Sequence, residues 1–282
     1  MVFQTVGLVA RVDRKKALDL AVKLSRYIEK KGLTVFLEPA LAKHAKKLDA
    51  SKPLEKMKTD LIITVGGDGT ILNTCLQIPK PEPPVLAINM GVRGFLTELM
   101  PKDAFEGVDK CLEGSFTLER CFKLASFIGK TRLPDALNEV FITSLAPAKL
   151  LHMRVWKNGG SVADCRSDGA VIASQVGSTG YSLSAGGPVL DPDLDAYVFT
   201  PICPLTVFHP IVFSAKSSLS VELLNPKRAF VVVDGHYKAE MNPKEARITV
   251  VKSEYESSFV RFKEDFYRRL KGRLLFSRGR GT

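Results

Sequence analysis

Residues 61–70 read Leu-Ile-Ile-Thr-Val-Gly-Gly-Asp-Gly-Thr. The continuous apolar run Leu61–Val65 has the length of a strand, and such runs are typical of a parallel sheet that is covered on both faces. The glycines at 66, 67 and 69 permit a sharp turn out of this strand, and a short helix is predicted from there to about Gln77. Prolines from Pro79 onward end that helix. A strand, a glycine-rich turn and a helix in this order are the repeating unit of an α/β fold.

The same alternation of strands and helices continues on both sides of this unit. Upstream, Asp13 is the predicted N-cap of a helix over 14–31, in which Leu24 and Ile28 lie on one face and Gly32 marks the end. Further strands are predicted at 5–10, 33–37 and 85–89, and a further helix at 102–112. The predicted fold class of this half is therefore α/β, with a doubly wound parallel sheet.

The pattern changes after about Gly114. Short β-rich runs follow, and Asn158-Gly159-Gly160 between two of them is typical of a hairpin turn. The second half is therefore predicted to be an antiparallel, β-rich domain. The runs are 115–123, 136–144, 150–157, 161–165, 170–174, 197–200, 211–213, 218–224, 230–233 and 247–251.

The end of the chain differs again. Phe259, Phe262, Phe266 and Leu270 recur at steps of three and four residues, which predicts an amphipathic helix. From residue 261 to 280 there are eight Lys and Arg against two acids, a net charge of +6. We expect this basic helix to pack back on the first domain, with a helix on a membrane surface as the alternative. The predicted domains are then an α/β domain at 1–114, a β-rich domain at 115–256 and the tail at 257–282.

Composition narrows the function classes. The 282 residues are 45% hydrophobic and 25% charged, as in an ordinary soluble globular protein, and no apolar run reaches the ~20 residues of a membrane helix. The five cysteines never occur as C-x-x-C, which argues against disulfides and structural zinc and favours a reducing cytosol. The net charge of +11 is compatible with anionic small substrates, whereas no zinc finger or RNP motif supports nucleic-acid binding. We expect a cytoplasmic protein that binds neither membranes nor nucleic acid.

The glycine-rich turn is the first candidate site. Backbone N–H groups of Gly66, Gly67 and Gly69 can approach a phosphate, together with Thr70 at the start of the helix. The motif is neither a Walker A loop nor a Rossmann fingerprint, because it lacks their spacing of glycines. An acid between glycines would repel a phosphate, so Asp68 makes sense if it accepts the proton of an attacking hydroxyl or helps to hold a metal. The alternative is a tight turn in which Asp68 caps the next helix.

Three further motifs contain candidate residues. Residues 166–169 and 177–188 gather hydroxyls, glycines and Tyr181, which suit ribose, phosphate and a stacked base, or form a plain glycine-rich loop. Asn138-Glu139 are polar residues inside an apolar run and need partners, either a ligand hydroxyl or an internal hydrogen bond. Asp234-Gly235-His236 is most simply a turn.

Taken in order, these motifs resemble those of the NAD kinase family. The glycine-rich motif alone is shared with lipid kinases of the diacylglycerol and sphingosine type and with phosphofructokinase-like folds. The full order is far more specific and extends from about Val6 to the C-terminus. It consists of 66–70, Gly94-Phe95-Leu96-Thr97, Asn138-Glu139, Asp168-Gly169, 177–188 and Asp234-Gly235.

The resemblance implies an α/β domain and a β-rich domain with the substrate between them, in a homodimer or homotetramer. It implies transfer of a phosphoryl group from ATP or polyphosphate to the 2′-hydroxyl of the adenosine ribose of NAD, which gives NADP. Asp68 matches the family's proton acceptor. The positions that match NAD contacts are Gly69, Asn73, Phe95, Asn138, Glu139, Lys149, Arg166, Asp168, Val176, Thr179, Gly180, Tyr181, Ser182, Leu183, Ser184 and His236.

A divalent metal, Mg²⁺, is expected to come with the phosphate donor. Mg²⁺ binds mainly through phosphates, so no set of metal ligands is predicted in the chain itself.

Two other classes of protein remain open. A lipid kinase shares the glycine loop but gives no reason for Asn138, Glu139 and Asp168, and a non-catalytic NAD-binding regulator has no need of Asp68. Thermal shifts with NAD and assays on lipid vesicles distinguish a kinase of NAD from a kinase of lipids. A turnover assay distinguishes an enzyme from a non-catalytic regulator.

Overall fold

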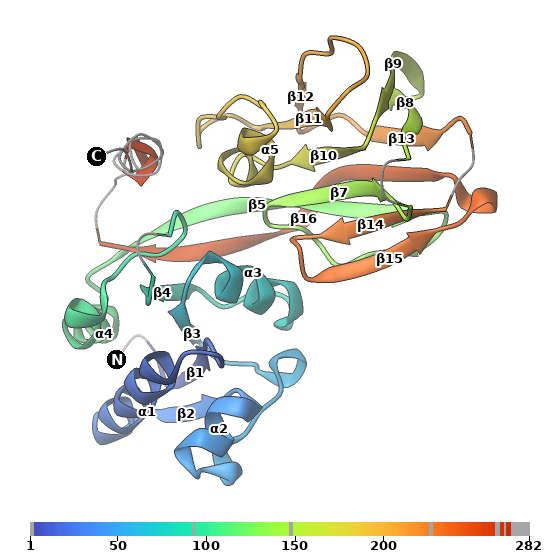
Figure 1. Cartoon of the computed structure of the whole chain (residues 1–282). Coiled ribbons are helices and arrows are strands. Elements are labelled where there is room, and N and C mark those ends of the chain that lie inside the picture. The colour runs from blue at the N-terminus through green and yellow to red at the C-terminus, as the bar shows by residue number, and fades with distance from the viewer. Residues whose placement is uncertain are drawn as a thin grey trace, which may run out of the picture. The chain divides into compact units, whose positions relative to one another are not determined.

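The computed structural model describes residues 3–91, 94–146, 149–225, 228–262, 266–267 and 269–271. The chain divides into two compact units (Figure 1): unit 1 comprises residues 1–120 and 257–282, and unit 2 comprises residues 121–256. Two long strands, β5 (Thr117–Ile128) and β16 (Arg247–Arg261), have residues in both units. None of the helices in the described ranges is long and apolar enough to cross a membrane.

Unit 1 is built on a parallel sheet. Its strands are β1 (Thr5–Ala10), β2 (Thr34–Leu37), β3 (Leu61–Gly66) and β4 (Val85–Asn89). Their order is β2-β1-β3-β4, followed by the end of β16, which pairs with β4 at Phe259 and Val85. All these pairs are parallel, so the predicted α/β sheet is confirmed.

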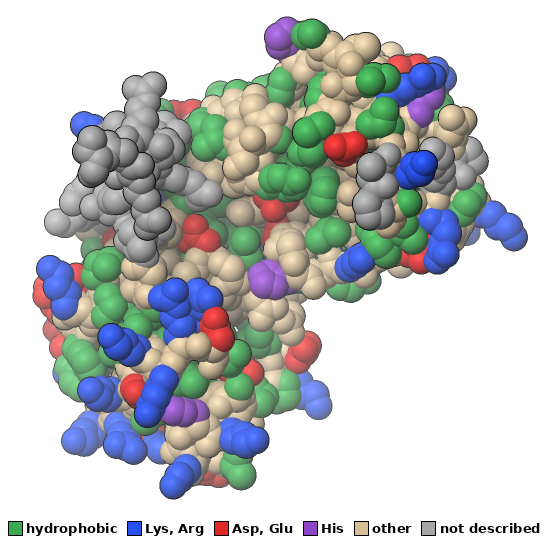
Figure 2. All heavy atoms as spheres, viewed as in Figure 1, with side chains coloured by type: hydrophobic (Ala, Val, Ile, Leu, Met, Phe, Trp, Pro, Cys, Tyr) green, Lys and Arg blue, Asp and Glu red, His purple; other side chains and the backbone are tan. Residues whose placement is uncertain are grey.

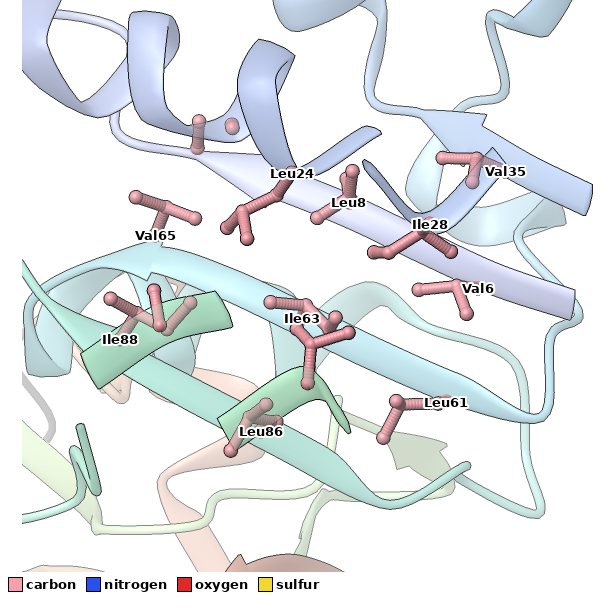
Figure 3. Packing of buried hydrophobic residues seen from close by; sticks show 14 of the residues in the cluster. Val6, Leu8, Leu24, Ile28, Val35, Leu61, Ile63, Val65, Leu86 and Ile88 are labelled. Carbon is pink, nitrogen blue, oxygen red and sulfur yellow. The ribbon is translucent and has the colours of Figure 1, made fainter. Parts of the chain in front are cut away.

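Helices lie on both faces of this sheet. They are α1 (Lys15–Lys30), α2 (Pro39–Ala45), α3 (Asp68–Gln77) and α4 (Ala104–Glu113). Alternate strand residues such as Leu8 and Ile63 pack with Leu24 and Ile28 of α1 in one hydrophobic cluster (Figure 3). Helix α3 contacts β1 and β3, but none of its buried residues belongs to that cluster, so it covers the opposite face.

Two details of unit 1 differ from the expectation. Asp13 does not cap α1, because the N-cap is Arg14 and the Asp13 carboxylate instead accepts a hydrogen bond from Arg11 Nε at 2.7 Å. Helix α2 was not predicted from the sequence. It is short, and it is started by Glu38, whose carboxylate accepts the N–H groups of Ala40 and Leu41.

Unit 2 is β-rich and antiparallel, as predicted. Besides parts of β5 and β16 it contains β6 (Thr131–Arg132), β7 (Glu139–Ser144), β8 (Leu151–Lys157), β9 (Gly160–Ser167), β10 (Gly169–Ala173), β11 (Ala196–Ile202), β12 (Ile211–Ser214), β13 (Leu219–Leu223), β14 (Ala229–Val233), β15 (Tyr237–Met241) and the short helix α5 (Tyr181–Ser184). One sheet has the order β12-β11-β10-β7-β14-β15. In the other, β16, β13, β8 and β9 follow one another.

Turn chemistry accounts for two hairpins of unit 2. Asn158 and Gly159 both have positive φ, 50° and 85°, which is the conformation of the predicted turn between β8 and β9. Asp234 and Gly235 also have positive φ, 49° and 71°, and join β14 to β15. The strand β15 was missed because its sequence, Tyr-Lys-Ala-Glu-Met, is largely polar.

The predicted tail helix is wrong at its start. Residues up to Arg261 belong to β16, and Phe259 is a fully buried strand residue. Helical backbone is found at residues 266–267 and 269–271, and the rest of the predicted helix, at 263–265, 268 and 272–282, lies outside the described residues. The phenylalanine spacing misled because Phe259 packs as a strand residue beside β4, not as part of a helical face.

Candidate active site

The glycine-rich loop lies where β3 ends and α3 begins. Gly67 is the N-cap of α3 and Asp68 is its first residue. A Cβ atom on Gly66 would overlap the side chain of Thr70, whereas a Cβ atom on Gly67 or Gly69 would meet none of the described residues within 4 Å. Gly66 is therefore required for packing, and Gly67 and Gly69 leave open backbone at a helix N-terminus. Open N–H groups at that end of a helix are suited to an anion such as a phosphate.

Asp68 is held by the segment after β4. Its Oδ2 accepts the N–H of Phe95 at 2.9 Å, and its Oδ1 accepts the N–H of Leu96 at 3.1 Å. The carboxylate therefore reaches out from α3 to residues 95 and 96, and it does not serve as the side-chain cap of that helix. The two bonds fix its orientation. Asp68 is half-buried.

Phe95 and Asn73 are the other predicted NAD-binding residues of unit 1. Phe95 is buried, and its ring packs edge-on against Phe266 at a centroid distance of 5.4 Å. The guanidinium of Arg269 lies over the same ring at 5.7 Å. Asn73 lies in α3, where its Oδ1 accepts a hydrogen bond from Gln77 at 2.7 Å. Phe95 is thus tied to the end of the chain, a contact that the sequence pattern does not reveal.

Unit 1 also carries almost all of the net positive charge of the chain. It holds 27 Lys and Arg against 17 Asp and Glu, a formal net charge of +10, whereas unit 2 holds 14 against 13. Many of these basic side chains are exposed over α1 and α2 (Figure 2). The unit that contains the glycine-rich loop therefore produces a positive field, which attracts anionic ligands.

In unit 2, Asp234 organises the Asn138-Glu139 motif. Its Oδ2 accepts the N–H of Leu137 at 2.7 Å, and its Oδ1 accepts the N–H groups of Asn138 and Glu139 at 2.8 and 2.9 Å. Burial raises the pKa of Asp234, and the three N–H donors and nearby Lys123 act in the opposite direction. The turn that the sequence predicts at Asp234 thus also positions the two polar residues before β7.

Asn138 and Glu139 face the segment that contains Gly180. A Cβ atom on Gly180 would lie 3.3 Å from Glu139 Oε2 and 3.4 Å from Asn138 Nδ2, and a Cβ atom on Gly177 would overlap the carbonyl of Asn138. These glycines let the two segments approach closely. Asn138 Oδ1 is buried and has no hydrogen-bond partner among the described residues, as expected of an atom that awaits a ligand.

The hydroxyls of residues 177–184 do not all face a ligand. Thr179 donates to the carbonyl of Val176 at 2.9 Å, and Ser182 shares a hydrogen bond of 2.9 Å with Thr200. Both side chains are buried, so these hydroxyls build the loop. Tyr181 is 41% exposed, and its ring packs edge-to-face with that of Phe141 at a centroid distance of 5.2 Å. Leu183 is half-buried and Ser184 is exposed.

Four predicted residues of unit 2 remain, and the structure places them apart, to different degrees, from the cluster of Asn138, Glu139 and Gly180: Lys149, Arg166, Asp168 and His236. His236 is exposed in the turn that begins with Asp234. Glu139 pairs with Ala173 and Thr143 with Gly169, so Asp168, just before β10, lies at the opposite end of that strand from Glu139, about 17 Å along the strand direction. Arg166 and Asp168 are exposed there, and Lys149 is exposed in the segment before β8. The sequence motif order does not show this separation, because it does not give the direction of β10.

The described residues contain no group of three or more His, Cys, Asp or Glu side chains arranged to hold a metal ion. Mg²⁺ usually keeps several waters and is bound through substrate phosphates with one or two carboxylates. A single half-buried carboxylate beside an open helix N-terminus fits a metal that arrives with a phosphate donor.

Three features of unit 1 are typical of a phosphate-binding transferase of the kinase class: an oriented carboxylate, open glycine backbone at a helix N-terminus and a net positive charge. The sequence matches the ATP-NAD kinase N-terminal domain over residues 6–116 and the ATP-NAD kinase C-terminal domain over residues 137–262. The chain belongs to the NAD kinase family.

Individual relatives agree with this family. The NAD kinase of Methanothermobacter thermautotrophicus is 38% identical over 273 residues, which cover 96% of both chains. A crystal structure of an NAD kinase from Archaeoglobus fulgidus in complex with ATP has a TM-score of 0.80 and 30% identity, covering 96% of this chain and 98% of that one. A yeast NADH kinase structure, 22% identical, has a TM-score of 0.89 over 100% of this chain and 90% of that one, and shares the fold.

Proposed function

We propose that this chain is a kinase that transfers the terminal phosphoryl group of ATP to the 2′-hydroxyl of the adenosine ribose of NAD and so makes NADP. Family membership over most of the chain supports the reaction. The observation that carries the mechanism is the carboxylate of Asp68, which is oriented by two backbone N–H groups beside the open glycines of the loop.

Asp68 is the proposed proton acceptor. A ribose hydroxyl is a weak nucleophile, and a carboxylate within hydrogen-bond distance orients it and takes its proton as the new P–O bond forms. The N–H groups of Phe95 and Leu96 keep the carboxylate in one orientation before the substrate arrives. The carboxylate is therefore already oriented when the reaction begins, and no entropy is lost in ordering it during the reaction.

The donor phosphates are assigned to the N-terminus of α3. In the described part of the chain, Gly67 and Gly69 have no neighbour within 4 Å of a Cβ position, so a phosphate can approach their backbone. Most of the acceleration in phosphoryl transfer comes from positioning and charge neutralisation. Mg²⁺ bound to the donor phosphates would supply part of that neutralisation, and Asp68 is the carboxylate within the loop itself.

NAD is assigned to the predicted contact residues, with unit 2 providing most of them. Asn138 and Glu139 would hold ribose hydroxyls or base edges, because Asp234 fixes their backbone and Asn138 Oδ1 is buried without a partner among the described residues. Tyr181 would stack on a planar base with its exposed face. Arg166, Asp168 and Lys149 would contact a different part of this long dinucleotide.

The proposal includes a homo-oligomeric state and a cytoplasmic location, both following from the resemblance to the family. All five cysteines are free thiols, which agrees with a reducing compartment. Light scattering on the purified chain measures the oligomeric state directly. Polyphosphate is the alternative donor to compare with ATP.

The test measures NADP with an NADP-specific dehydrogenase, using NAD, Mg²⁺ and either ATP or polyphosphate, with and without EDTA. We expect NADP from the wild type, and we expect Asp68→Asn to lower kcat by about 10²–10⁴-fold while NAD still binds in calorimetry. Absence of NADP with either donor would overturn the reaction, and near-wild-type kcat in the variant would overturn the role of Asp68.

Asp60→Asn is a matched control for this variant. The Asp60 carboxylate also accepts two backbone N–H groups, those of Gln4 and Thr5 at 2.9 and 2.8 Å, and it lies in the same unit. Its replacement removes the same kind of hydrogen bond at the beginning of β1. We therefore expect Asp60→Asn to lower stability with an unchanged kcat.

A further inference from the structure

Arg261, the last residue of β16, is a buried arginine in unit 1. Only 4% of its side chain is exposed. A buried guanidinium is costly unless it is neutralised and hydrogen-bonded. Here two carboxylates serve that purpose: Arg261 Nε donates to Glu119 at 2.5 Å, and Nη1 lies 3.4 Å from Glu98.

The same guanidinium contacts the backbone of the segment that holds Asp68. Arg261 Nη1 donates to the carbonyl of Leu96 at 2.9 Å, and the N–H of Leu96 donates to Asp68 Oδ1 at 3.1 Å. One residue, Leu96, therefore connects Arg261 to the carboxylate of Asp68. Glu98 strengthens this connection, because its Oε1 accepts the N–H of Phe262 at 2.9 Å.

We propose that Arg261 is a positioning residue for phosphoryl transfer, because it fixes Leu96 and through it the orientation of the Asp68 carboxylate. This inference rests on the proposed role of Asp68 as proton acceptor. It assigns a function in the reaction to a residue about 190 positions away in the sequence, at the end of the chain's last strand.

The charges around Arg261 agree with a rigid support. Burial alone would raise the pKa of Glu119, but the charges and hydrogen bonds of Arg261 and Arg269 outweigh it and lower that pKa. Arg269 donates to both oxygens of Glu119, at 2.9 and 3.1 Å, and its guanidinium also lies over Phe95. Glu119 thus holds both arginines, and these contact two adjacent residues: Arg261 binds the carbonyl of Leu96, and Arg269 lies over the ring of Phe95.

The test is a double-mutant cycle on the full chain. Arg261→Lys keeps the charge but loses the planar fork that contacts Leu96, Glu98 and Glu119 together. We expect it to lower kcat by about tenfold to a hundredfold, with the KM for NAD changed by less than about twofold, because only the base is misplaced. In the Asp68→Asn background the same substitution should lower kcat by less than about twofold.

Losses that multiply in the double variant would overturn the inference, since a purely structural effect is independent of Asp68. An unchanged kcat in folded Arg261→Lys would overturn it as well. Val260→Ala is the matched control: it truncates the adjacent, fully buried residue on the opposite face of β16, and we expect a lower melting temperature with unchanged kcat. If Arg261→Lys does not fold, Glu119→Gln replaces it in the cycle, with the same expectation.

Hydrogen exchange gives a readout that does not need turnover. We expect the amide hydrogens of Phe95 and Leu96 to exchange faster in Arg261→Lys than in the wild type, and those of β1 to be unaffected. Unchanged exchange at both amides would overturn the positioning role whatever the activity. An inactive wild type with faster exchange in the variant would instead show that the proposed reaction is wrong and that the support of Asp68 exists.

Discussion

Gly94 has no space for a side chain because Asp68 occupies it. A Cβ atom at Gly94 would overlap Asp68 Oδ1 and would lie 2.8 Å from Thr97 Oγ1. This glycine is therefore required by the carboxylate itself.

Gly94→Ala should consequently displace the carboxylate or the segment that holds it. We expect kcat to fall by about a hundredfold, because displacements of about 1 Å have that effect. Gly91→Ala is the control, since among the described residues its Cβ would meet only Asn89 Oδ1, at 3.4 Å. Equal kcat values for the two variants would show that the Asp68 orientation does not limit turnover.

Gly67 allows a test of the phosphate assignment. Alanine fits there, because no residue that the structure describes lies within 4 Å of its Cβ and the φ of −126° is ordinary. Stability should stay within about 0.5 kcal/mol of the wild type, while the KM for ATP should rise roughly tenfold or more, because hydrogen bonds to a charged phosphate are blocked. Gly160→Ala in unit 2, with its nearest neighbour at 3.6 Å, should change neither quantity. A normal KM in Gly67→Ala would place the phosphates elsewhere.

Asp234→Asn tests the support of the Asn138-Glu139 motif. An amide presents one oxygen where the carboxylate presents two, so at least one of three backbone N–H groups loses its acceptor. We expect a loss of about 1–3 kcal/mol in unfolding free energy and a raised KM for NAD. Asp164→Asn, which breaks an exposed ion pair with Arg154 in the same unit, should cost about 1 kcal/mol or less and leave the KM unchanged. The idea fails if both variants bind NAD equally well.

Glu119 predicts a specific dependence of stability on pH. Its pKa is lowered in the folded chain, so its ionised form stabilises the fold above the unfolded pKa and that contribution is lost as the pH falls through the folded pKa. Glu119→Gln should therefore cost about 3 kcal/mol at pH 7 and progressively less below about pH 4. Chemical denaturation of both proteins from pH 7 to pH 3 measures the difference. A cost that is independent of pH would show that the charge of Glu119 does not contribute.

Much of unit 1 could be predicted because its signals are local. The strands β1 and β4 match the expected residues, since continuous apolar runs between turns are sufficient to define buried strands. Strand β16 shows the limit of this reasoning. Its residues 252–258, Lys-Ser-Glu-Tyr-Glu-Ser-Ser, have the composition of a loop, and they are extended because β16 pairs with β5. Pairing between distant segments overrides local propensity.

The candidate site likewise has a part that local sequence predicts and a part that only distant contacts determine. The motif order points to Asp68, Asn138, Glu139 and Tyr181 and to the family. Gly94 and Asp234 are members of its motifs, Asp234 as a turn residue, but the sequence predicts no individual role for either, and Arg261 enters only as part of the basic tail. A buried carboxylate that accepts three backbone N–H groups looks like any Asp-Gly turn in the sequence.

By itself, the sequence determined the α/β and β-rich halves, the glycine-rich loop and the acid within it, because these depend on residue type and on the spacing of neighbours. Only the tertiary structure decided which groups hold that acid. Residues 68, 95, 96 and 261 are joined by hydrogen bonds between segments that are far apart in the chain, and such contacts arise when the strands β3, β4 and β16 align in one sheet. The orientation of a catalytic carboxylate depends on that packing, so it cannot be predicted from the local sequence.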